Sequence, residues 1–383
     1  MYFKKIKFAE TIALLSLCFS VNAQIGLTTE GYFPGEGISY DAQTEKYTIK
    51  YLDNDGVTGS MITLYYQSPN KVKPNLKMRF RSDRTRDINY SYDIGNERTA
   101  KQAMYTFSLY TQAPWFENAS LVTNGDATVH ASTGNFASAT LALESRFAYA
   151  TRIEENRMRQ PSKWLPEIEF AKTNKAFALS WQAHPNELPF DDIQPGQRRT
   201  GFGIVAPYLP GLVEFGFKGY AEPLAFPTAY GGDSKIWEDI KKLKRGSKEP
   251  LPRLDALGPK ILIPDPFNTK LLAKAISDDL ASWVTAGQLS EPLAQRLRLT
   301  LAAAGEAAER NNEEGVEGHV KQIFIEIFGR HKGMDHKEFD EEREERRVDQ
   351  PELSYLAARA IGFNASELLK RYSLANKRSG AKK

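Results

Sequence analysis

Cysteine is nearly absent from this sequence of 383 residues, in which Cys18 stands alone. That residue lies in an N-terminal segment where three lysines precede the apolar stretch 12–21 and the triplet Val21-Asn22-Ala23. This order is typical of a secretory signal peptide over 1–23, and we expect cleavage after Ala23. The mature chain then has no cysteine, which excludes disulfides, zinc sites with cysteine ligands and a cysteine nucleophile.

Long apolar runs and an excess of charge are also lacking. No stretch after residue 23 approaches the roughly 18 consecutive apolar residues of a spanning helix, so we expect a secreted or periplasmic protein without a membrane span. Loss of three lysines and one glutamate with 1–23 lowers the formal net charge from +3 to +1, which gives no sign of specific nucleic-acid binding. Phosphate-binding loops are missing as well, so we expect no nucleotide and no cofactor.

The residues that are present follow two hydrophobic periods. Over 24–232 apolar residues alternate with polar ones, as in Leu76, Met78 and Phe80, which predicts an antiparallel β-sandwich of an immunoglobulin-like or jelly-roll-like kind. Over 267–372 the period is 3.6, which predicts a small α-helical bundle. Charges and prolines predict a linker over 233–266, and 373–383 reads as a basic polar tail. The fold class is therefore mixed and multidomain.

Helix boundaries are indicated by single residues in the second half. Ser290 can cap a helix that has Pro292 in its first turn, and the stripe that ends at Phe328 stops before Gly329. Asn364 and Glu367 have the spacing of a capping box, which predicts a helix start there.

The order of these predicted helices is similar to that of a known helical module. Ala-Ser-Trp-Val-Thr-Ala-Gly-Gln-Leu-Ser at 281–290 is followed by the helical stretches 293–308, 317–325 and 353–369. This order resembles the FIMAH-type helical module found near the C-termini of exported bacterial proteins. The resemblance implies an accessory role and supplies no catalytic residues. The charged stretch 331–349 is an insertion relative to that module.

Basic residues are concentrated in the segment 71–87, which carries seven lysines and arginines against two aspartates. Alternation places Lys77, Arg79 and Arg81 on one solvent face of a strand, where they could bind an anionic polymer. Arg84 and the loop residue Trp115 are the further candidates for this ligand-binding site. The competing interpretation is a solubilising strand face that is neutralised by acids such as Asp93 or Glu97 on a neighbouring strand.

Acidic residues offer a weaker catalytic candidate. Trp181 is followed by Glu187, Asp191 and Asp192, and glycoside hydrolysis needs two carboxylates facing each other across a sugar. Alternation predicts that Trp181 packs in a core, and the adjacent aspartates point to opposite sides if extended. No histidine or acidic group has the spacing of a metal site, so we expect none.

These patterns favour an exported binding or scaffolding protein over an enzyme. The expected partner is an anionic surface or extracellular glycan, or another exported protein. Two alternatives stay open, a secreted polysaccharide-degrading hydrolase and a structural envelope component.

Overall fold

The structure is a computed structural model that describes residues 32–53, 60–82, 86–111, 158–171, 176–184, 191–221, 235–246, 250–329 and 352–380. The predicted signal segment 1–23 and the charged stretch 331–349 lie outside these residues. The described chain divides into two compact units. Unit 1 takes the residues up to Lys71 and those of Tyr220–Pro250, and unit 2 takes those of Val72–Gly219 and Leu251–Lys383.

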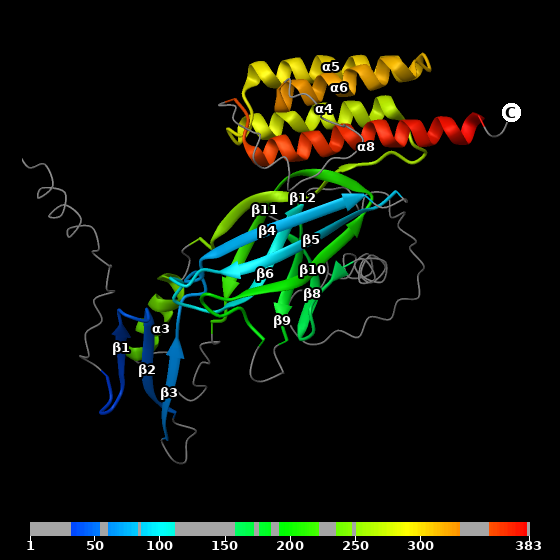
Figure 1. Ribbon diagram of the computed structural model, residues 1–383. Helices are drawn as coiled ribbons and strands as arrows, with labels where there is room; N and C mark the ends of the chain where they lie inside the picture. The colour runs from blue at the N-terminus through cyan, green and yellow to red at the C-terminus, as the bar shows by residue number, and fades with distance from the viewer. Residues whose placement is uncertain are drawn as a thin grey trace, which may run out of the picture. The chain divides into compact units, whose positions relative to one another are not determined.

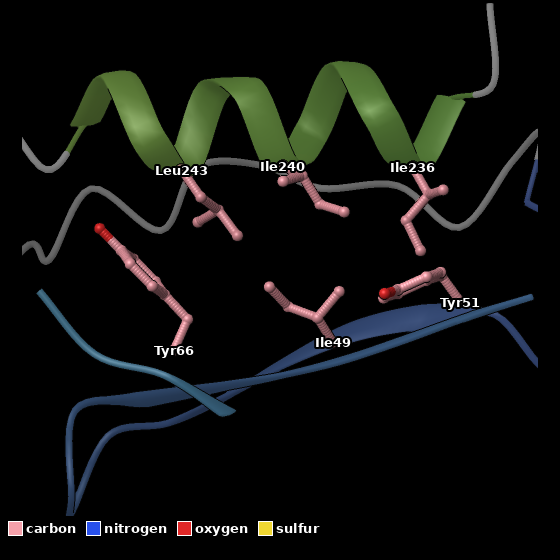
Figure 2. Close-up of a cluster of buried hydrophobic side chains, with 6 residues drawn as sticks. All are labelled: Ile49, Tyr51, Tyr66, Ile236, Ile240 and Leu243. Carbon is pink, nitrogen blue, oxygen red and sulfur yellow. The ribbon is translucent and has the colours of Figure 1, made fainter. Parts of the chain in front are cut away.

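In the residues that the structure describes, unit 1 is a three-stranded antiparallel sheet with one helix. The strands are β1 (Gly37–Asp41), β2 (Lys46–Asp53) and β3 (Ser60–Tyr66) in that order, and the helix is α3 (Lys235–Gly246). Alternation along β2 buries Ile49 and Tyr51, and three helix residues at i, i+4 and i+7 form the facing apolar stripe. Figure 2 shows this stripe, Ile236, Ile240 and Leu243, directed at Ile49, Tyr51 and Tyr66. This apolar contact joins two segments that are far apart in the sequence.

Unit 2 contains two antiparallel sheets (Figure 1). The first has the order β4 (Pro74–Ser82), β5 (Ile88–Asn96), β10 (Arg198–Ala206) and β7 (Met158–Arg159). The second has the order β12 (Arg253–Leu262), β11 (Tyr208–Gly219), β6 (Met104–Thr111), β9 (Ala176–Ala183) and β8 (Trp164–Ala171). Aromatic side chains of the two sheets contact one another, with Tyr92 5.3 Å from Phe215 and Phe107 4.7 Å from Phe202 between ring centroids. The alternation in the sequence therefore produces a shared aromatic core.

Four helices complete the described part of unit 2, namely α4 (Thr269–Thr285), α5 (Glu291–Glu309), α6 (Glu313–Phe328) and α8 (Tyr355–Gly380). The predicted cap is confirmed, because the Ser290 side chain accepts a hydrogen bond from the Leu293 amide and Pro292 lies in the first turn of α5. The helix α6 ends at Phe328 with Gly329 as its cap, as the sequence predicts. Figure 1 shows the four helices side by side, and α4 and α8 both contact β11 and β12.

Three expectations differ from the structure. The segment 233–266 is not an extended linker, because it holds α3 and the strand β12. The charged run belongs to α3, where Lys241 and Lys242 are exposed and Leu243 is buried. Pro259 lies in β12, at the end of its sheet and beside a register shift opposite Pro210, which is where strands tolerate proline.

The remaining differences concern α8. The sequence predicts a helix start at Asn364, but α8 runs through that position without a break, and Asn364 is buried. Its side-chain nitrogen donates to the Pro210 carbonyl 2.9 Å away, so tertiary contact takes the place of capping. The helix also continues to Gly380, through most of the expected polar tail.

Candidate functional site

The candidate basic residues lie on the strand face that the alternation predicts. Along β4, Lys77, Arg79 and Arg81 are exposed, while Phe80 between them is buried. The neighbouring strand β5 brings Asp93, Ser91 and Asn89 directly opposite these three residues. We use the term outward face for this side of the sheet formed by β4, β5, β10 and β7.

One of the three cations has an acidic partner on the outward face. Arg79 Nη2 lies 3.2 Å from Asp93 Oδ2, and the side chain of Arg79 stays 72% exposed against 17% for Asp93. The competing interpretation, a strand face neutralised by acids of the neighbouring strand, is therefore right for Arg79. Within the described ranges, Lys77, Arg81 and Glu97 make no ion pair. The β4 face thus keeps a net positive charge.

Two further arginines, which the sequence does not predict as site residues, lie on the outward face. Arg159 of β7 donates from Nη2 to the Tyr90 carbonyl at 2.8 Å. Arg198 of β10 donates from Nη1 to the Asp93 carbonyl at 3.1 Å and from Nη2 to Asn75 Oδ1. Arg159 stands in a strand of two residues, too short for any periodicity, whereas Arg198 follows the Gln194-Pro195-Gly196 turn signal and opens a strand.

The other candidate residues are placed apart from this face or not described. Arg84, Trp115 and Glu187 lie outside the described residues. Trp181 has no exposed surface, and its indole nitrogen donates to the Arg159 carbonyl at 3.1 Å, so it belongs to the core as the alternation predicts.

Asp191 and Asp192 have separate partners. The Asp191 carboxylate forms an ion pair with Arg199, and the Asp191 carbonyl accepts the indole N–H of Trp164. The Asp192 carboxylate accepts a hydrogen bond from Gln194 Nε2 at 2.6 Å. Burial raises the pKa of Asp192 above its ordinary value, although the bond from Gln194 acts in the opposite direction. The adjacent carboxylates therefore sit in two different environments and do not form a facing pair.

The described residues give no sign of other site types. No three histidine, aspartate, glutamate or cysteine side chains gather there as metal ligands would. None of the described helices is both long and apolar enough to cross a membrane. The sequence matches no protein-family model and no curated protein.

Proposed function

We propose that this protein is an exported, non-catalytic binding or scaffolding protein that recognises an anionic surface or extracellular glycan through its outward face. The observation that carries the proposal is the exposed row Lys77, Arg79 and Arg81 on β4, which faces a single carboxylate, Asp93, on β5. Guanidinium groups donate forked hydrogen bonds that match carboxylate, sulfate and phosphate oxygens. Alternate residues of a strand are about 6.6 Å apart, so the row offers repeated contacts to a repeating anion.

The remaining parts of the chain have supporting roles in this proposal. The segment 1–23 acts as a signal peptide that is cleaved after Ala23, and export gives access to glycans outside the cytoplasm. The two sheets of unit 2 form a β-sandwich, a proposal supported by the aromatic contacts between them. The helices α4, α5, α6 and α8 form an accessory module of the FIMAH type, supported by the order of the helices in the sequence.

A binding experiment with the purified mature chain tests the proposal. The variant Lys77→Gln/Arg79→Gln/Arg81→Gln is compared with Lys270→Gln/Lys274→Gln/Arg310→Gln, which removes three exposed cations from the helical part. On an array of anionic and neutral glycans, we expect the strand variant to bind anionic glycans about tenfold more weakly and the helix variant to bind as the unmodified chain does.

Other results lead to the alternatives. Release of reducing sugar from a bound polysaccharide would contradict a non-catalytic role and favour the hydrolase. Absence of binding to every glycan would contradict the proposal and favour a structural envelope component. Equal binding by the strand and helix variants would place the ligand elsewhere on the molecule.

A further inference from the structure

Two positions of the outward face are glycines, and an arginine guanidinium occupies the space beside each of them. A Cβ at Gly203 would collide with the Tyr90 carbonyl oxygen and lie 2.8 Å from Arg159 Nη2. A Cβ at Gly95 would collide with Asn75 and lie 3.1 Å from Arg198 Nη2. The sequence therefore leaves room for both arginine side chains to lie along the sheet surface.

Uncharged groups hold both guanidinium groups in place. The acceptors of Arg159 are the Tyr90 carbonyl and the Ser91 hydroxyl, and those of Arg198 are the Asp93 carbonyl and the Asn75 amide oxygen. None of these acceptors neutralises a positive charge. Arg199, the residue after Arg198, differs because it forms an ion pair with Asp191. Arg159 and Arg198 are thus positioned in advance and keep their charge, which lowers the entropic cost of binding an anion.

The outward face as a whole then carries cations on three of its four strands. Lys77, Arg79 and Arg81 lie on β4, Arg198 lies on β10 and Arg159 lies on β7. Adjacent strands are about 4.8 Å apart, so the cations extend over about 14 Å across the strands. At the strand positions of this face that the structure describes, Asp93 is the one carboxylate. The charge therefore forms a surface and is not confined to a single row.

The chemistry of this face favours a polysaccharide over other polyanions. The neutral side chains between the cations are polar, among them Asn75, Asn89 and Ser91, and they suit a polymer rich in hydroxyl groups. No aromatic residue occupies a described outward strand position, whereas single-stranded nucleic acids are bound through aromatic stacking. The face is also poor in the large apolar side chains that insert into membranes.

We infer that Arg159 and Arg198 are ligand-contacting residues, and that an anionic polysaccharide binds across the strands, from β4 to β7. This inference rests on the proposed function and adds to it the path of the ligand and two residues. The anionic groups contacted are carboxylates or sulfates, because each of them presents neighbouring oxygens that accept paired hydrogen bonds from one guanidinium group.

The test measures dissociation constants of the mature chain for dextran sulfate and polygalacturonate, with neutral dextran as the uncharged probe. The variant Arg159→Gln/Arg198→Gln is compared with Lys274→Gln/Arg310→Gln, which removes two paired, exposed cations of the helices. We expect the first variant to bind at least one of the two anionic polymers about tenfold more weakly, with a salt slope lower by about two, and the second to be unchanged. The polymer affected identifies the anionic group.

A second variant, Arg159→Lys/Arg198→Lys, separates charge from folding. It keeps both charges but loses the forked donors, so we expect the salt slope of the unmodified chain and an affinity between those of the Gln variant and the unmodified chain. A salt slope that falls equally in the Lys and Gln variants would overturn the inference, as would Gln-variant affinity within about twofold of the original. If the β4 variant loses binding and the Arg159/Arg198 variant does not, the inference fails while the proposed function stands. If the unmodified chain binds neither polymer, or binds only duplex DNA or anionic vesicles, the proposed function fails as well.

Discussion

Asp239 is the one carboxylate on α3 that has no exposed side-chain surface. Its Oδ2 accepts hydrogen bonds from Lys235 Nζ at 2.5 Å and from Tyr32 Oη at 2.8 Å, and its Oδ1 accepts one from Lys242 Nζ at 2.9 Å. Burial alone would raise the pKa of Asp239, but the hydrogen bonds from Lys235, Lys242 and Tyr32 lower it below its ordinary value. The ionised form therefore stabilises unit 1.

This residue makes the stability of unit 1 depend on pH. Because the pKa is lower in the folded state, the stabilisation is present above the unfolded pKa of about 4 and is lost as the pH falls through the folded value. We expect Asp239→Asn to lower the stability of unit 1 by about 2 kcal/mol at neutral pH, with a difference that shrinks below about pH 4.

Hydrogen exchange of the β2 and α3 amides measures this stability. Glu238→Gln, at an exposed carboxylate of the same helix, is the control and should change little. A difference for Asp239→Asn that is equally large at pH 7 and pH 3 would disprove the assignment.

At the scale of secondary structure, α8 contacts strands from the ends of both sheets. β4 and β12 are terminal strands in the two strand orders, and such strands leave backbone groups unpaired. Arg359 of α8 donates to the Met78 carbonyl of β4 at 2.8 Å, and Arg371 donates to the Arg86 carbonyl at 3.1 Å. Phe363 packs on Phe80, with ring centroids 4.8 Å apart. The helix therefore satisfies a carbonyl of β4 and one just before β5 and adds an apolar contact, while the outward face of β4 stays exposed.

This contact predicts how unit 2 responds to changes in α8. Truncation of a buried aromatic residue removes its transfer free energy and leaves a cavity, so we expect Phe363→Ala to destabilise unit 2 by about 3 kcal/mol. Leu374, 43% exposed on the same helix, is the matched control, and Leu374→Ala should cost about 0.5 kcal/mol. Urea denaturation followed by the amide protection of β4 measures both. Equal stability of the two variants would show that α8 does not support the sheets.

Local sequence signals predict where strands and helices lie better than they predict which residues these elements contact in the fold. Alternation predicts β4, β5 and β11, and the cap at Ser290 predicts the start of α5, because both signals act within a few residues. The same reasoning fails at Pro259 and Asn364, because the strand pairing of the first and the buried environment of the second arise from residues far away in sequence. The candidate site divides in the same way. The row on β4 is visible in the sequence, whereas the positions of Arg159 and Arg198 depend on cross-strand contacts.

At the scale of the whole molecule, the order of the chain does not follow the division into units. The chain passes between the two units three times, and α3 is inserted between β11 and β12, which are hydrogen-bonded neighbours. A division of the sequence by hydrophobic period cannot reveal this, since strands of both units share the period of two. The net charge of the chain is likewise a poor guide to the outward face, because it averages over a molecule in which five cations face one carboxylate locally.

The salt dependence of binding tests the central claim most directly. Release of counterions from a polyanion makes the logarithm of the affinity fall linearly with the logarithm of salt concentration, with a slope set by the number of cations engaged. We expect the affinity of the mature chain for an anionic polysaccharide to fall with a slope of about 3 to 5. With Lys77, Arg79, Arg81, Arg159 and Arg198 all replaced by Gln, the slope should approach zero. A slope that is the same for this variant and for the unmodified chain would contradict the account.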